Sequence, residues 1–278
     1  MAADDAHSLV YDSAPLTEAI DIMGMPQVHL RVAADAPFYQ WTVRLEDVAP
    51  DGKVSLVSGA AINPSQRFSR LAPAALVPGE PTTLATSIHF TTWRFQPGHR
   101  IRLAVANAQF PMIWPSPTPG TTHLLLGENT WLELPKVPVA NATDQACTLP
   151  PPEPSDVAPF GRELDKHNPV FNSVRDEQTG DSTFTTASDI TWVIRENKYQ
   201  SRESYRWSVN DATPANAQYH GERRNVFNIA GNEIDLATTA RIASDAGYFN
   251  VTFTKTLRQN GSLVREKTWT DHIPRRYQ

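Results

Sequence analysis

Apolar and polar residues alternate in short runs along the first half of the chain. In residues 27–32, Val28, Leu30 and Val32 alternate with polar neighbours, and residues 39–48 repeat the pattern. A period of two residues is typical of a β-strand that buries one face. Similar runs predict further strands at residues 54–62, 82–92, 99–106, 123–126 and 130–134. Because no run here has a helical period, we expect a two-sheet sandwich.

Turn-forming residues separate these runs. Ala49-Pro50-Asp51-Gly52 follows the run 39–48, where proline presets φ and glycine supplies a positive φ. Longer alternating runs follow one another between residues 184 and 273, and Asn260-Gly261 between the last two predicts a two-residue hairpin turn. The second half therefore predicts an antiparallel meander or a partial barrel.

A proline-rich segment joins the two halves. Residues 135–159 contain seven prolines, which predicts an extended linker or a strap. A simple tether and a strap docked on the sandwich both fit this composition. We therefore expect three parts: a β-sandwich at 1–138, a Pro-rich linker or strap at 139–183, and an antiparallel β domain at 184–278.

Composition and charge narrow the function. The 278 residues include 25 basic and 30 acidic ones, giving a net charge of −5 without a basic patch, so we expect neither nucleic acid nor membrane as a partner. The single cysteine, Cys147, excludes an intrachain disulfide and a cysteine-based zinc site. The acidic start and the absence of a long apolar run predict a cytoplasmic protein.

The sequence shows no catalytic motif. An α/β-hydrolase nucleophile needs a strand-to-helix elbow of the form G-x-S-x-G, and this pattern does not occur. Histidine and carboxylate spacings typical of metal sites and glycine-rich phosphate loops are also absent from the sequence. We therefore predict no catalytic, cofactor-binding or metal-binding residues.

Five residues are candidates for structural or docking roles. Asp47 lies among apolar strand positions and is expected to pair with Arg102 or Arg67, while His99 is expected to support a turn. Trp114, in the rigid segment Trp-Pro-Ser-Pro, is expected to pack either on another domain or on the sandwich itself. Strand tryptophans mostly pack in cores, but a sugar-stacking role stays open for Trp41, Trp93 and Trp131.

Several segments together resemble the C-terminal part of the X-Pro dipeptidyl-peptidase and cocaine-esterase-like (CocE/NonD) hydrolases. Their order and spacing carry the resemblance, and they cover residues 8 to 138: Ser13 to Leu16, Leu30 to Pro37, Arg44 to Gly52, Asn63 with Arg67, Leu76 to Gly79, Gly98 to Val105, Trp114 to Pro117 and Leu132 to Pro135. Residues 206–211 and 269–275 are similar to the extended tail of one subgroup of this family.

The resemblance implies a jelly-roll β-sandwich that follows the hydrolase domain and helps to wall the active site or a dimer interface. The Ser, Asp and His triad of this family lies upstream of the segment that residues 9–12 resemble. We therefore expect an accessory, non-catalytic module whose partner is an α/β-hydrolase catalytic domain or a second copy of the chain. Two alternatives stay open: part of an Xaa-Pro dipeptidyl-peptidase or ester hydrolase whose catalytic domain is supplied elsewhere, and a carbohydrate- or ligand-binding sandwich.

Overall fold

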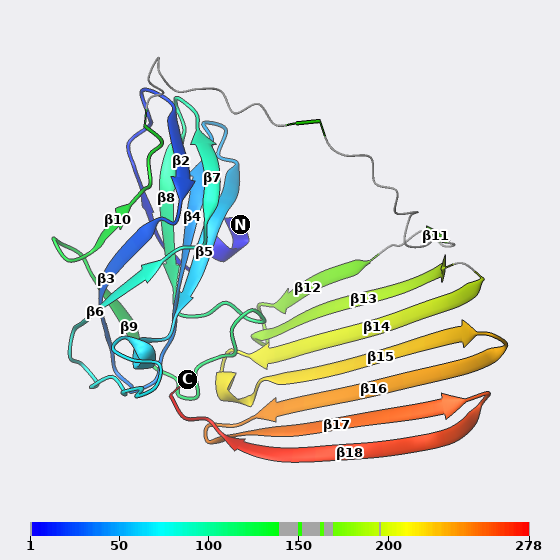
Figure 1. Cartoon of the computed structure of the whole chain (residues 1–278). Coiled ribbons are helices and arrows are strands. Elements are labelled where there is room, and N and C mark those ends of the chain that lie inside the picture. Colours follow the sequence, from blue (N-terminus) through cyan, green and yellow to red (C-terminus); the bar gives the residue numbers. More distant parts are fainter. Residues whose placement is uncertain (1, 139–149, 152–161, 164–168, 195, 278) are drawn as a thin grey trace. The chain divides into compact units, whose positions relative to one another are not determined.

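The computed structural model describes residues 2–138, 150–151, 162–163, 169–194 and 196–277. The chain divides into two compact units (Figure 1). Unit 1 comprises Met1–Gln145 with Tyr277–Gln278, and unit 2 comprises Ala146–Arg276. Almost all of the described regular structure is antiparallel β, which confirms the predicted all-β fold class.

Unit 1 is a β-sandwich. One sheet has the strand order β1-β8-β4-β5, a second has the order β10-β3-β6 with β9 also pairing with β3, and β2 pairs with β7. The elements are α1 (Ala2–Asp5), β1 (Leu9–Asp12), β2 (Ile20–Gly24), β3 (Gln27–Ala34), β4 (Trp41–Val48), β5 (Val54–Ile62), η1 (Pro64–Gln66), β6 (Thr82–Ser87), β7 (Thr91–Phe95), β8 (Arg100–Ala106), β9 (Thr122–Leu125) and β10 (Trp131–Glu133).

The core of unit 1 lies between strands that alternate as the sequence predicts. Val28, Leu30 and Val32 of β3 pack in one cluster with Trp41, Val43 and Leu45 of β4, and Phe95 and Val105 complete it. Each of these side chains is almost entirely removed from water. Burial of such side chains contributes about 1.5–3 kcal/mol apiece, so this cluster is the main source of stability in unit 1.

Two predicted turns are confirmed. Ala49 to Gly52 reverses the chain between β4 and β5, and Gly52 adopts a φ of 85° there. Asn260 and Gly261 join β17 to β18 with φ values of 50° and 79°. A positive φ at both central residues is the requirement of the type I′ hairpin turn.

Two strand predictions need correction. The run 82–92 forms two strands, because β6 pairs with β3 whereas β7 pairs with β2. The buried Ile88 lies in the segment that connects β6 to β7. Strand β4 was expected to bury one face, but every residue of β4 is buried. The second face is covered because the segment around α1 contributes Asp5 to it.

Unit 2 is a long antiparallel meander, as predicted. Its sheet has the order β11-β13-β14-β15-β16-β17-β18, and β12 also pairs with β13 (Figure 1). The elements are β11 (Arg162–Glu163), β12 (Val170–Asp176), β13 (Asp181–Ile194), β14 (Asn197–Asn210), η2 (Pro214–Asn216), β15 (Gln218–Ile229), β16 (Asn232–Ser244), β17 (Tyr248–Gln259) and β18 (Ser262–Pro274).

The register of this sheet sorts its side chains into an apolar face and a polar face. One row across five strands consists of Phe184, Trp207, Tyr219, Ile242 and Val251. The adjacent row on the other face contains Thr183, Ser208, Gln218, Ala243 and Asn250. Because successive side chains of a strand point to opposite faces, the rows alternate across the sheet, and the apolar face carries most of the aromatic residues of unit 2.

Aromatic contacts run across the apolar face. The ring centroids of Phe184 and Trp207 lie 5.7 Å apart, and those of Trp207 and Tyr219 lie 5.1 Å apart. Trp192 stacks on Tyr199 at 6.0 Å. Such pairs contribute about 0.5–1.5 kcal/mol each beyond their buried area, and they fix the strand register.

The predicted linker or strap at residues 139–183 lies mostly outside the described residues. Within it the structure places β11 and β12, and β13 begins at Asp181. The division at 138 and 184 stays a prediction.

We predict that Leu45→Ala lowers the free energy of unfolding of unit 1 by about 2–5 kcal/mol, because it opens a cavity in a fully buried cluster. The matched change Leu71→Ala, at a side chain that is 98% exposed, should alter it by less than about 0.5 kcal/mol. Urea denaturation followed by tryptophan fluorescence measures both values. Equal effects of the two changes would contradict the assignment of the core.

Candidate functional site

Strand β4 carries polar side chains toward both of its faces. Asp47 follows Trp41, Val43 and Leu45 in the alternation, so it shares their face. Its Oδ1 is 2.8 Å from Nδ1 of His99, and its Oδ2 accepts a hydrogen bond from Trp93 Nε1 at 3.0 Å. This buried carboxylate is therefore fully engaged by an imidazole and an indole.

The prediction that Asp47 pairs with Arg102 or Arg67 is wrong. Arg102 lies opposite Glu46 in the register of β4 and β8, so its side chain belongs to the other face of the sheet. A difference of one residue reverses the face of a strand. His99 reaches Asp47 instead, from the turn before β8, and its backbone N–H donates to the carbonyl of Gln96 at 3.1 Å. His99 therefore closes the turn before β8, as expected, and its side chain also binds Asp47 of β4.

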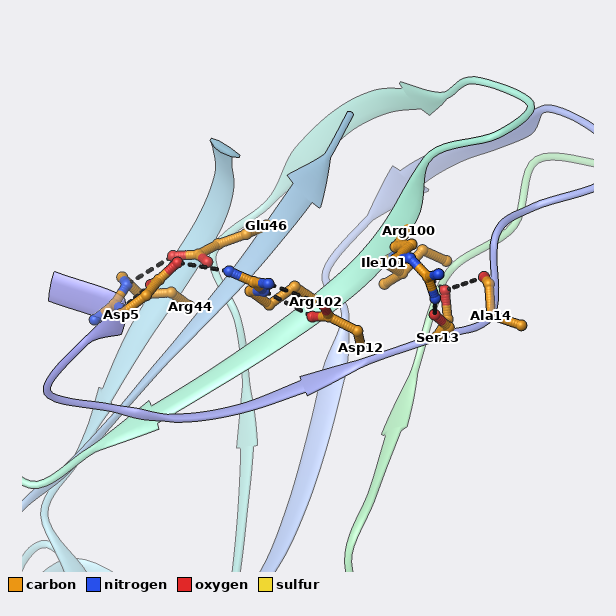
Figure 2. A network of polar contacts seen from close by, with 9 residues as sticks. All are labelled: Asp5, Asp12, Ser13, Ala14, Arg44, Glu46, Arg100, Ile101 and Arg102. Atoms are coloured by element: carbon orange, nitrogen blue, oxygen red, sulfur yellow. Dashed lines mark hydrogen bonds and ion pairs between the residues drawn. The ribbon is translucent and has the colours of Figure 1, made fainter. Parts of the chain in front are cut away.

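The other face of β4 carries a network of ion pairs (Figure 2). Arg44 Nε donates to Glu46 Oε1 at 2.8 Å, and Arg44 Nη2 donates to Asp5 Oδ1 at 2.7 Å. Arg102 Nη1 donates to the second oxygen of Asp5 at 2.9 Å. Arg102 also binds both carboxylate oxygens of Asp12, at 2.6 and 2.8 Å. Asp5 therefore bridges two arginines from adjacent strands.

Further bonds extend this attachment beyond β1. Arg100 Nη1 donates to the carbonyl oxygen of Ser13 at 2.8 Å, and the backbone N–H of Ile101 donates to Ser13 Oγ at 3.0 Å (Figure 2). Ser13 Oγ in turn donates to the carbonyl of Ala14 at 2.7 Å. Together with the pairing of β1 and β8, these contacts hold residues 5–14 against the sheet.

The carboxyl groups of the network differ in their electrostatic surroundings. Three carboxyls face two guanidiniums, and the Glu46 side chain is fully buried. Burial raises the pKa of Glu46, and the nearby Asp5 carboxylate adds to this rise. Glu46 Oε2 has no hydrogen-bond partner among the described residues. The bidentate hydrogen bond from Arg102 lowers the pKa of Asp12. The network therefore raises the pKa of its most buried carboxyl group, Glu46, and lowers that of Asp12.

Arg67 holds a loop rather than a strand carboxylate. Its guanidinium donates to the carbonyl oxygens of Pro64, Ala74 and Ala75 at 2.9, 2.7 and 3.1 Å. These bonds close the segment between η1 and the start of β6. Asn63 caps η1, accepting a hydrogen bond from the backbone N–H of Ser65.

Exposed apolar side chains gather on the loops at one end of unit 1. The loops 35–40, 63–81 and 107–121 all join strand ends there, and hydrogen bonds link them: Leu76 N–H to the carbonyl of Pro37, and Thr121 N–H to Asp35 Oδ1. We call this surface the apolar loop end. It consists of Phe68, Leu71, Val77 and Met112, of which Leu71 is 98% and Met112 81% exposed.

Trp114 lies in one of these loops, where its ring forms an edge contact with Phe110 at a centroid distance of 6.1 Å. It is half-buried rather than fully displayed. The expectation that it contributes to a docking surface stays a prediction, and Met112 is the more accessible residue of the same loop.

The three tryptophans considered for sugar stacking differ in their surroundings. Trp41 is buried in the core, and the indole N–H of Trp93 is bound to Asp47. Trp131 is 40% exposed and stacks on His29 at 3.8 Å. Of these three, Trp131 alone presents an open ring, beside a groove that includes Leu126 and Leu134.

The described residues contain no group of three or more His, Cys, Asp or Glu side chains that could hold a metal ion. None of the helices within the described segments has the length and apolar character needed for a membrane crossing. Within each polar cluster just described, the side chains bind one another or the backbone. They define a β-sandwich module built from structural ion pairs.

The comparison with protein families identifies this module. Residues 1–145 match the family of the X-Pro dipeptidyl-peptidase C-terminal non-catalytic domain, and the chain belongs to that family. The resemblance to the C-terminal region of CocE/NonD hydrolases is thereby confirmed.

Relatives of known name are hydrolases. The chain is 32% identical over 123 residues to a putative serine esterase of Mycobacterium bovis, covering 38% of this chain and 20% of that protein. It is 29% identical over 103 residues to cocaine esterase of a Rhodococcus species, covering 37% and 18%. The matched part thus spans about a fifth of the length of these relatives. An α-amino acid ester hydrolase structure matches with 26% identity and a TM-score of 0.45, covering 47% of this chain and 26% of that chain.

The sequence pattern did not predict the ion-pair network around Asp5, Arg44 and Glu46. Arg44 and Glu46 interrupt an apolar run, which is the signal that could have singled them out. Their partner Asp5 is 39 residues away from Arg44 in the chain, and nothing in the local pattern indicates that pairing.

We predict that Glu46→Gln makes unit 1 more stable than the wild type at neutral pH, because the pKa of Glu46 is raised in the folded protein. Because the folded pKa of Glu46 is raised, its contribution to stability is fully present below its ordinary pKa and is lost as pH rises through the folded pKa. Glutamine keeps an oxygen for Arg44 and does not ionise. The stability difference should therefore grow from pH 4 to pH 8 in urea denaturation.

Asp12→Asn is the matched control with the opposite sign. The lowered pKa of Asp12 means that its contribution is present above its ordinary pKa and is lost as pH falls through the folded pKa. This variant should therefore be less stable than the wild type at pH 7 and approach it at acidic pH. Parallel pH profiles for both variants would contradict the charge assignment.

Proposed function

We propose that the chain acts as an accessory module that docks on the catalytic domain of an α/β-hydrolase-type esterase or peptidase. The match of residues 1–145 to a family of non-catalytic domains carries this proposal. The sequence lacks the G-x-S-x-G elbow of such hydrolases, so the catalytic serine would come from the partner. The named relatives, about five times longer than the matched segment, are esterases.

The apolar loop end is the surface that we assign to this docking. Phe68, Leu71 and Met112 are each at least 79% exposed. Large apolar side chains that are exposed together on a protein surface favour a protein interface. Arg67 and Asn63 hold the backbone that presents two of them. A preorganised loop loses little conformational entropy on binding, so this surface suits a permanent intramolecular or intersubunit contact.

Self-association is the second use of the same surface. A two-fold homodimer would bury the loop end against its own copy, and the available observations do not favour it over a catalytic domain. Sugar binding receives less support, because two of the three tryptophans considered for it are engaged inside unit 1.

We predict that the chain associates with an esterase catalytic domain through the loop end. A practical partner is the Mycobacterium bovis putative serine esterase with its matching segment removed. Analytical ultracentrifugation should show a one-to-one complex, and hydrolysis of p-nitrophenyl acetate should require the partner. Leu71→Asp should weaken the complex at least about tenfold, since it places a charge in a desolvated contact.

Leu56→Asp is the control for this test. Leu56 is an exposed leucine as well, at 47% compared with 98% for Leu71, but it lies near the start of β5, away from the loop end. It should leave the complex intact. Absence of a complex, or equal weakening by both changes, would contradict the docking surface, while turnover by the chain alone would contradict the accessory role.

We further predict the outcome for the chain by itself. If the loop end also forms a homodimer, Met112→Asp should convert dimer to monomer in sedimentation velocity while far-UV circular dichroism stays unchanged, because Met112 is 81% exposed. A wild-type chain that stays monomeric at high protein concentration would exclude the homodimer and leave the catalytic domain as the partner.

A further inference from the structure

The apolar face of unit 2 contains a pocket with three cations at its rim. The pocket has a volume of about 370 Å³ and is lined by Leu236, Leu257 and Trp269 together with Lys255, Arg265 and Lys267. Its size falls within the range of small-molecule sites, roughly 300–1,000 Å³. It therefore combines an aliphatic and aromatic lining with concentrated positive charge.

The sheet register explains why these residues meet. Leu236 lies opposite Leu257, which lies opposite Arg265, so all three share one face across β16, β17 and β18. In the next row of that face Lys255 lies directly opposite Lys267. Two like charges opposite each other on a sheet destabilise it. The same row continues into Thr238, Arg223 and Glu203, while the rows on either side of the pair contain Leu236 with Leu257 and Phe253 with Trp269.

No carboxylate in the part of the chain that the structure describes forms an ion pair with Lys255, Arg265 or Lys267. The Nζ atom of Lys267 lies 4.7 Å from the ring centroid of Trp269. On the same face of β18 the acidic residue is Asp271, four positions from Lys267, or roughly 13 Å along a strand. The positive charge of the pocket is therefore locally uncompensated.

This chemistry selects an amphipathic anion. Leucine and tryptophan side chains accept a hydrocarbon chain, while two ammonium groups and a guanidinium bind a carboxylate by charge-assisted hydrogen bonds. A second copy of the sheet fits less well, because a copy of the pocket lining brings three more cations and no carboxylate. We propose that the pocket binds a long-chain carboxylate, with its head at Lys255, Arg265 and Lys267 and its tail against Leu236 and Leu257.

The test is isothermal titration of the full chain with three amphiphiles that share a twelve-carbon chain, each kept below the concentration at which it aggregates or separates from water. Dodecanoate should bind at one site, while dodecanol and dodecyltrimethylammonium should bind at least about tenfold more weakly. Lys255→Gln and Lys267→Gln should each weaken dodecanoate binding about tenfold, the loss expected for one charge-assisted hydrogen bond.

Arg258→Gln is the matched control, because Arg258 follows Leu257 on β17 and points to the opposite face. It removes the same charge and should leave the affinity unchanged. The folding of every variant is checked by its thermal transition. Lys255→Gln removes the like-charge pair and leaves the contact of Lys267 with Trp269 in place, so its transition should not fall below that of the wild type.

Acetylation footprinting on the wild-type chain locates the ligand without any substitution. Dodecanoate should protect Lys255 and Lys267, whereas the exposed Lys53 of unit 1 should react as before. The proposal is overturned if dodecanol binds as tightly as dodecanoate, if Arg258→Gln and Lys267→Gln lose affinity equally, or if binding appears only with micelles or vesicles. These results do not depend on unit 1 docking to a catalytic domain.

Discussion

The burial of β4 on both faces is the constraint on which unit 1 depends. One face of this strand supplies Trp41, Val43 and Leu45 to the hydrophobic core, and the other presents Arg44 and Glu46. Buried charges are tolerated only when they are paired. The charges of β4 are therefore paired, because Asp5 binds Arg44 and Arg102 lies opposite Glu46 on the neighbouring strand. The bond to Asp5 holds the N-terminal segment against the sheet.

The same alternation separates two polar sites that are neighbours in sequence. Asp47 points toward the core face and is held by Trp93 and His99, while Glu46 points into the ion-pair network. The most exposed large apolar side chains of unit 1, those of Phe68, Leu71 and Met112, lie on the loops at one end. A module with ordered strands and an apolar loop surface suits a supporting role beside a catalytic domain, which is the role that its family membership indicates.

Unit 2 follows a different principle, because long strands of strict alternation form one extended sheet with an apolar face and a polar face. Aromatic rows such as Phe184, Trp207 and Tyr219 stabilise the register. That register brings Lys255 and Lys267 together on the apolar face. A like-charge pair costs stability in the free protein, and a bound anion offsets that cost, so the arrangement is better explained by a ligand than by folding alone.

The sequence alone determined the features that depend on near neighbours. Period-two alternation indicated most of the strands, Pro50 with Gly52 and Asn260 with Gly261 indicated two turns, and the ordered segments of residues 8–138 indicated the family. The tertiary structure alone decided which charges meet. Asp47 binds His99 rather than Arg102 because the register puts Arg102 on the opposite face, and Asp5 reaches Arg44 across 39 residues. Strand register and long-range pairing depend on the packing of the whole sheet, so local propensity carries no information about these partners.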